Sequence, residues 1–196
     1  MSGLRERKKK ATRDAIHHGA MRLFEEHGFA GTTIDQIADA ADVSRATVFS
    51  YFPTKEDIVF GEAPQAVAAL EALLQDAPAT IPAVRGWLQA LSGWIEPALL
   101  LQRRLAREVP GVAARRLRIS GDIQRIVAAA LERELDDPLS ARLAAASLTA
   151  ALDVAEDTAA ARMENDGGAL GDAEIGAILD AAIAYTEAGV AALRDD

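Results

Sequence analysis

"ADAADVSRATVFSYF", residues 38–52, is the stretch that decides the fold of the N-terminal part of the chain. A short apolar-periodic run ends near Asp42, and Ser44 then introduces a second helical segment, residues 45–51. The outward face of that segment carries Arg45, Ala46, Thr47, Phe49, Ser50 and Tyr51. A core helix would not hold so many polar groups, and a plain surface helix would not hold so many aromatic rings. The pattern predicts a short helix built to contact a partner.

The residues around this stretch predict a helix-turn-helix. Thr33 and Gln36 fit a capping box for a helix that begins at residue 34, and Ser44 is a good N-cap for the next helix. Ala38 is small where the two helices would cross, and Asp42 tolerates the positive φ of a tight turn. Two short helices with this spacing are typical of DNA-binding proteins, but they also occur as ordinary packed helices.

The rest of the chain predicts an all-α protein, because alanine and leucine recur at helical spacing and β-branched alternation is absent. A first helix is expected over residues 8–27, with Gly28 just after its end. A helix over residues 55–75 should be kinked or broken by Gly61 and Pro64. After a linker at residues 75–82, helices are expected over residues 83–93, 97–107, 112–135 (one piece or two, split near Gly121), 139–165 and 173–194.

The composition of the 196 residues excludes several classes of protein. Without cysteine there is neither a disulfide framework nor a thiolate metal site. No apolar run approaches the roughly 20 residues of a membrane span, and the basic start lacks the apolar region of a secretory signal. The three histidines lack metal-ligand spacing, and glycine-rich nucleotide motifs are absent. We therefore expect no metal, no cofactor, no enzyme activity and no membrane partner.

The net charge of −9 argues against nucleic acid only until its distribution is considered. Residues 1–60 hold nine basic and nine acidic residues, so the whole acidic excess lies in residues 61–196. Residues 1–13 carry six basic side chains against a single glutamate. Contact with phosphates depends on such local clustering rather than on the total charge. The basic start is either a nucleic-acid-binding arm or a solvated, disordered tail.

The sequence resembles the DNA-binding domain of TetR-type (tetracycline-repressor-like) transcriptional regulators. The resemblance covers residues 8 to about 58 and is carried by "AMRLFEEHGFAGTTIDQIADAADVSRATVFSYFPTKEDI", residues 20–58. It implies a three-helix DNA-binding domain over residues 1–54, followed by a larger helical effector-binding and dimerisation domain over residues 55–196. Three residues depart from the common pattern: Asp42 replaces glycine, Phe49 replaces tyrosine and Tyr51 replaces histidine.

The candidate DNA-binding residues follow from chemistry and from this resemblance. Arg45 can reach a guanine edge, and Phe49 can contact a thymine methyl group. The hydroxyl groups of Thr47 and Ser50 can reach phosphates or bases. Tyr51, Lys55 and Thr33, at the start of the helix that begins at residue 34, are placed for phosphate contacts. The full set is Thr33, Ser44, Arg45, Ala46, Thr47, Phe49, Ser50, Tyr51 and Lys55.

Two apolar stripes near the C-terminus are either part of the chain's own core or a dimer interface. They consist of Leu148, Leu152, Ala155, Ala159 and Met163, and of Leu179, Ile183, Val190 and Leu193. The resemblance implies a homodimer in which the last two helices of each copy form a four-helix bundle. A palindromic double-stranded DNA operator would need two such DNA-binding domains, which favours the dimer.

Small-molecule binding is implied by the resemblance and only weakly by the residues. The candidate effector-binding residues are Trp87, Leu91, Trp94 and Arg104. Six arginines between residues 103 and 118 are either a solvated face that pairs with acidic groups or a site for an anionic effector. The resemblance implies that effector binding changes the tilt of the fourth helix and separates the two DNA-reading helices.

The sequence thus predicts a sequence-specific transcriptional regulator of the bacterial cytoplasm. By resemblance it is a repressor, released from its operator by a small-molecule effector. The alternative is a helical effector- or partner-binding protein whose N-terminal domain no longer binds DNA. Binding that weakens steeply with salt on a palindromic probe would separate the two interpretations.

Overall fold

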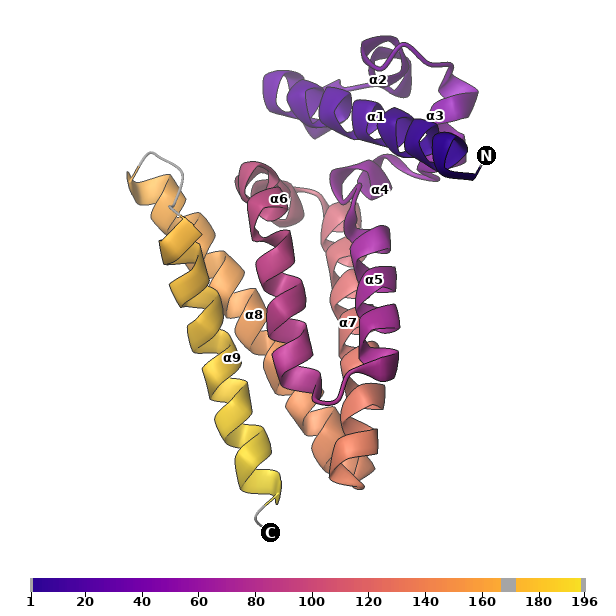
Figure 1. Cartoon of the computed structure of the whole chain (residues 1–196). Coiled ribbons are helices and arrows are strands. Elements are labelled where there is room, and N and C mark those ends of the chain that lie inside the picture. The colour runs from indigo at the N-terminus through magenta and orange to yellow at the C-terminus, as the bar shows by residue number, and fades with distance from the viewer. Residues whose placement is uncertain (1, 167–171, 195–196) are drawn as a thin grey trace. The chain divides into compact units, whose positions relative to one another are not determined.

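A computed structural model describes residues 2–166 and 172–194, without the side chains of residues 2, 92–97, 166, 172, 193 and 194 (Figure 1). All elements in these ranges are α-helices. In chain order they are α1 (Ser2–Gly31), α2 (Ile34–Ala40), α3 (Arg45–Tyr51), α4 (Lys55–Val59), α5 (Ala63–Asp76), α6 (Thr80–Glu108), α7 (Pro110–Leu135), α8 (Pro138–Asp166) and α9 (Asp172–Arg194).

The helices divide into two compact units. The head unit comprises residues 1–63 together with residues 104–116, and the bundle unit comprises residues 64–103 together with residues 117–196. The head unit therefore extends past the boundary predicted at residues 54 and 55. It also includes the end of α6 and the start of α7, which are far away in sequence.

Helix α1 begins earlier than predicted and ends its regular course where predicted. It starts at Ser2 instead of residue 8, so the basic N-terminal segment is helical and the alternative of a disordered tail is wrong. Arg7 Nε donates to the Gly3 carbonyl at 3.2 Å within this first part of the helix. Gly28 has φ 75° and ψ 162° and breaks the helix before it ends at Gly31. A positive φ favours glycine at that position.

The caps and the turn of the helix-turn-helix are confirmed. Thr33 and Gln36 form the capping box of α2, and the Ser44 hydroxyl accepts from the backbone N–H of Thr47 at the start of α3. Asp42 has φ 52°, and the N–H of Val43 donates to the Ala38 carbonyl at 3.0 Å. Each cap satisfies a backbone donor that the helix itself leaves unpaired.

The helix expected over residues 55–75 is two helices. α4 is capped by Thr54 and ends at Val59, and α5 begins at Ala63. Pro64 lies in the first turn of α5, where a missing N–H costs little. Gly61 lies in the break, and a Cβ atom there would come within 2.6 Å of His17 Nδ1, so the approach of α1 to this loop requires glycine.

The predicted break between residues 93 and 97 is wrong. Segments 83–93 and 97–107 form the single helix α6, and Pro97 lies within it. A proline removes one backbone hydrogen bond and kinks a helix, but it need not end the helix when packing holds both halves. Here Leu88 before it and Leu99 after it are both buried. α7 runs through Gly121 without a break, so the one-helix alternative is confirmed.

The bundle unit is built around an apolar core shared by α5, α6, α7, α8 and α9 (Figure 1). The α8 stripe turns inward: Leu148, Leu152 and Ala155 belong to this core, and Ala159 and Met163 pack with Leu99 of α6 in a second cluster. From α9, Ile183 and Val190 are buried in the same core, and Leu179 packs against it. The Leu193 side chain lies outside the described residues. The described members of these stripes therefore pack within the chain's own core, and Ala155 also lines a groove between α8 and α9.

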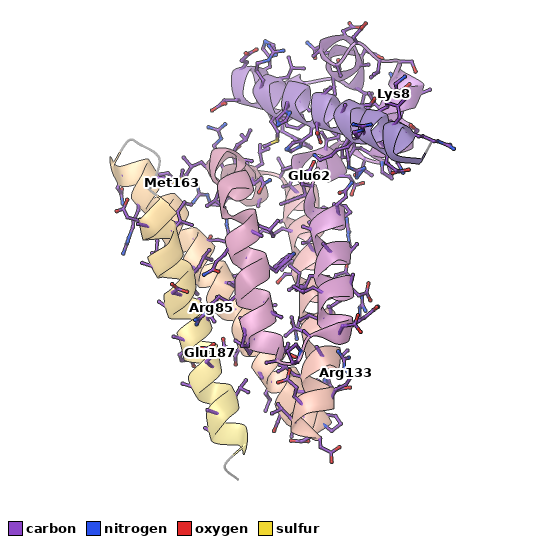
Figure 2. All side chains as sticks on the ribbon, viewed as in Figure 1. Lys8, Glu62, Arg85, Arg133, Met163 and Glu187 are labelled. Atoms are coloured by element: carbon purple, nitrogen blue, oxygen red, sulfur yellow. The ribbon has the colours of Figure 1, made fainter. Side chains whose placement is uncertain are left out.

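Ion pairs join α6 to the C-terminal helices of the bundle unit. Arg85 lies 3.0 Å from a carboxylate oxygen of Glu187, and its Nε lies 3.7 Å from Asp180, both on α9 (Figure 2). Further along α6, Arg103 is 4% exposed and pairs with Glu156 and Asp157 of α8. Burial of a guanidinium requires such partners, so these residues fix α6 against α8 and α9.

Candidate nucleic-acid interface

The outward face of α3 combines ordered hydroxyls with an exposed ring. The Ser44 and Thr47 hydroxyls lie 2.8 Å apart, and the Ser50 hydroxyl donates to the Thr47 carbonyl at 2.7 Å. Phe49 is 41% exposed, although Val48 beside it is fully buried. The hydroxyl oxygens keep acceptor capacity beyond these bonds. The face is therefore held rigidly by local bonds while its polar groups stay open to a partner.

Arg45 provides the only charge on α3, and its guanidinium is held from two sides. Its Nη1 donates to the two carboxylate oxygens of Asp35 on α2, at 3.1 and 3.3 Å. Its Cζ lies 5.6 Å from the centre of the Phe49 ring. Asp35 was not among the residues predicted from sequence. The signal that could have found it is the helix-turn-helix geometry, which brings the first turn of one helix beside the start of the next.

Thr33 and Lys55, both predicted to contact phosphates, also have structural roles. The Thr33 hydroxyl bonds with the side chain and N–H of Gln36 in the capping box. Lys55 Nζ donates to the carbonyls of Phe29 at 2.5 Å and Thr32 at 2.9 Å, and it lies 4.2 Å from the Phe29 ring centre. Burial lowers the pKa of Lys55. Two of the three ammonium donors are therefore engaged within the head unit.

Arg13 of α1 connects the end of α3 to the loop after α4. Its Nη1 donates to the Tyr51 carbonyl at 3.3 Å, and its Nε donates to the Gly61 carbonyl at 3.1 Å. Its Cζ also lies 4.5 Å from the Phe52 ring centre. From the sequence, Arg13 was only one of several basic residues near the N-terminus. In the structure it fixes the orientation of the α3 C-terminus.

The basic start of the chain is an exposed, ordered part of α1. Lys8, labelled in Figure 2, lies on this helix with Arg5, Arg7 and Lys9, and all four are exposed. Lys10 pairs with Asp14 one turn later at 2.9 Å. The structure therefore provides a positive helical extension of the head unit, suited to a phosphate backbone.

The junction between α6 and α7 packs on α4 within the head unit. Arg115 Nε lies 2.6 Å from one carboxylate oxygen of Asp57. The other oxygen of Asp57 accepts from the Thr54 N–H at 3.1 Å and from the Thr54 hydroxyl at 2.7 Å. A Cβ atom at Gly111 would come within 2.9 Å of Glu56, which shows how closely α7 approaches α4. α7 thus supports the N-terminal cap of α4.

The four predicted effector-binding residues do not all belong to one unit. Trp87 is half-buried against the bundle core and donates from Nε1 to the Ala66 carbonyl of α5 at 3.0 Å. Leu91 is half-buried on the same helix. Arg104 is exposed and belongs to the head unit, and the Trp94 side chain lies outside the described residues. Trp87 therefore has a packing role between α5 and α6.

The arginines between residues 103 and 118 do not form one surface either. Arg103 and Arg118 belong to the bundle unit, and the other four belong to the head unit. Arg103 and Arg115 pair with carboxylates of their own units. For these two residues the structure supports the interpretation as ion-pairing groups rather than as an anion site.

The outer surface of α8 and α9 forms an apolar groove of about 650 Å³, here called the C-terminal groove. Val154 and Tyr185 in its lining are 66% and 70% exposed. It is lined by Ser147, Ala150, Ala151, Val154, Ala155, Thr158, Arg162, Ala177, Ile178, Ala181, Ala182 and Tyr185. The expectation that no apolar run approaches the length of a membrane span is wrong: Ala173–Ala192 is long and apolar enough by length and composition alone, with 22% of its apolar window buried, although one such helix is weak evidence for a span.

Comparisons with known proteins agree with this geometry. Residues 16–60 match the description "Bacterial regulatory proteins, tetR family". The HTH-type transcriptional regulator TcmR of Streptomyces glaucescens is 32% identical over 160 residues, which cover 71% of this chain and 69% of TcmR.

Two solved structures share the fold at low identity. A complex of SmeT with triclosan has a TM-score of 0.64 at 21% identity and covers 89% of this chain and 91% of its own. Thermus thermophilus FadR in complex with lauroyl-CoA has a TM-score of 0.55 at 22% identity and covers 90% of this chain and 94% of its own. The chain belongs to the TetR family and is a helix-turn-helix transcriptional regulator.

Proposed function

We propose that this regulator binds a palindromic DNA operator as a homodimer in the bacterial cytoplasm and that a small-molecule effector releases it, so that it acts as a repressor. The observation that carries the proposal is the exposed face of α3, where Arg45 and Phe49 are presented on a helix whose inner side is buried. A side chain held in this way can enter the major groove with little loss of conformational entropy.

The dimer is proposed to form across the C-terminal groove, with a second copy as the occupant. The groove is apolar, and its exposed residues Val154 and Tyr185 would leave water on association. The apolar surface of α9 also needs a cover, since only 22% of the most apolar window within Ala173–Ala192 is buried within one chain. A palindromic operator requires two α3 helices, which one chain cannot supply.

Effector release is proposed to act through the helices that contribute to both units. α6 and α7 each run from one unit into the other, and their junction packs on α4 through Arg115 and Asp57. A ligand that favours another position of α6 in the bundle unit would move this junction and the cap of α4 with it. The complexes of SmeT with triclosan and of FadR with lauroyl-CoA are precedents for ligand binding in this fold.

The test is selection of duplex DNA from a random library by the purified protein, followed by titration at increasing salt. We expect an enriched palindrome with half-sites about one helical turn apart. We also expect its affinity to fall steeply with salt as phosphate contacts release counterions. If no sequence is enriched and no salt-dependent binding is seen, the alternative of a head unit that no longer binds DNA is correct.

A further inference from the structure

The Asp35–Arg45 pair lies on the exposed side of the helix-turn-helix and contributes little to the stability of the fold. The two side chains are 66% and 60% exposed, and Nη1 of Arg45 reaches Asp35 at 3.1 Å. Exposed ion pairs of this kind stabilise a fold very little, because solvent screens them and two long side chains lose freedom. The pair joins the first turn of α2 to the first residue of α3.

The geometry of this contact leaves one edge of the guanidinium open. Both carboxylate oxygens of Asp35 accept from Nη1 alone, and within the part of the chain that the structure describes, Nε and Nη2 have no hydrogen-bond partner. The two open groups form a planar fork that matches the O6 and N7 acceptors of guanine. The centre of the Phe49 ring lies 5.6 Å from Cζ, within the range of a cation–π contact.

The negative charge of Asp35 also opposes contact of Arg45 with a DNA phosphate, the simplest role for an exposed arginine. Residues 33–52 carry three aspartates, Asp35, Asp39 and Asp42, and Arg45 is their only basic residue. A carboxylate beside Arg45 would be repelled by a phosphate group that the arginine approached. It would not be repelled by a neutral base edge, and an aspartate can itself accept from a cytosine amino group.

We propose that Asp35 is a positioning residue for base recognition: it holds Nη1 of Arg45 so that the Nε–Nη2 edge meets a guanine, and it disfavours the use of Arg45 on phosphates. Asp35 thereby increases specificity more than affinity. This inference rests on the proposed function, because it assumes that the exposed face of α3 enters the major groove.

The test compares Asp35→Ala with Asp39→Ala on the operator selected by the unmodified protein. Asp39 is an exposed residue of the same helix, so its substitution removes the same charge from the same helix. Affinities for the operator and for a scrambled duplex of equal length are measured by fluorescence anisotropy at fixed salt. The specificity ratio is the dissociation constant for the scrambled duplex divided by that for the operator. It should fall roughly tenfold for Asp35→Ala and stay within about twofold of the unmodified protein for Asp39→Ala. Asp35→Asn, which keeps an acceptor oxygen, should give an intermediate ratio.

Affinities for single-base variants of the operator test whether Asp35 acts by positioning Arg45. Asp35→Ala and Arg45→Ala should relax discrimination at the same base pair, and the double variant should relax it no further than Arg45→Ala alone. A ratio unchanged in Asp35→Ala, or relaxation at a different base pair, would overturn the role of Asp35 while leaving the proposed function intact. Failure to select an operator, or unchanged operator affinity in Arg45→Ala, would overturn the proposed function and this inference with it.

Discussion

The exposed face of α3 and the C-terminal groove are both open surfaces, but they are built in different ways. On α3, hydroxyls and Arg45 are tied to neighbouring groups by hydrogen bonds, so their directions are fixed. In the groove, small apolar residues of α8 and α9 leave a hollow that offers few directional hydrogen-bonding groups. Fixed polar groups discriminate between partners, whereas apolar surface contributes binding energy without direction.

This difference separates the tasks that we propose for the two surfaces. A directional, charged surface suits DNA, whose base edges differ in donors and acceptors and whose binding weakens with salt. An apolar groove suits association between copies of the chain, which salt affects little. Single substitutions on one surface should therefore impair either DNA binding or dimer formation, but not both. A substitution that impairs both would show that the two tasks are not separate.

The largest effect is expected from Val154→Asp in the C-terminal groove. If a second copy covers the groove, the change buries an unpaired charge in both copies and weakens the dimer by about 3 kcal/mol or more. Sedimentation at micromolar concentration should show monomers whose helical content is unchanged. Leu117→Asp is the control, because Leu117 of α7 is just as exposed, at 68%, and lies outside the groove. Equal dissociation of both variants, or of neither, would contradict this assignment of the groove.

A smaller effect is expected from Arg13→Ala, which alters the support of α3. The change removes two hydrogen bonds from a charged donor and the contact with Phe52, so unfolding of the head unit should become easier by about 2 kcal/mol. Operator affinity should fall as well, while dimer affinity stays unchanged. Arg22→Ala is the control on the same helix, since among the described residues Arg22 makes only an exposed ion pair with Glu26. Chemical denaturation with a probe of the head unit measures the stability of both variants. A similar loss of stability in Arg13→Ala and Arg22→Ala would argue against the role of Arg13.

The smallest effect is expected from the pH dependence of His17. Burial lowers the pKa of His17, although its hydrogen bond to the Ile58 carbonyl at 2.7 Å opposes the shift. The carbonyl can only accept, so Nδ1 carries the proton in this hydrogen bond. As the pH falls through about 6.5, the unfolded chain binds a proton that the folded chain does not, and the stability of the head unit decreases.

His17→Asn should reduce this pH dependence, because the amide can donate to Ile58 but does not titrate. His27→Asn, at an exposed position of the same helix, is the matched control substitution. Thermal unfolding between pH 5 and 8 measures the difference between the variants. Identical pH profiles for the original protein and His17→Asn would contradict the assignment.

Local features of the fold could be predicted from the sequence because their causes lie within a few residues. The caps at Thr33 and Ser44 and the turn at Asp42 each depend on neighbours three or four positions away. The contacts of Arg13 with residues 38 and 48 positions away depend on the tertiary fold, and no local pattern indicates them.

Periodicity identified which residues of α8 are buried but not what covers them. Leu148 and Leu152 lie on a buried stripe, as predicted, yet they pack in the core of their own chain. The continuity of α6 through Pro97 was missed for a related reason, since tertiary packing outweighed the local effect of a proline. The open residues of the groove, mostly alanine with Val154 and Tyr185, carry no apolar periodicity strong enough to stand out.

The most direct test of the account is the operator affinity of Arg45→Ala, measured by titration of the selected duplex at fixed salt against the unmodified protein. We predict a loss of about 1–3 kcal/mol in specific binding, with thermal stability and dimer affinity unchanged. An unchanged operator affinity in a correctly folded Arg45→Ala protein would contradict the claim that the exposed face of α3 reads DNA.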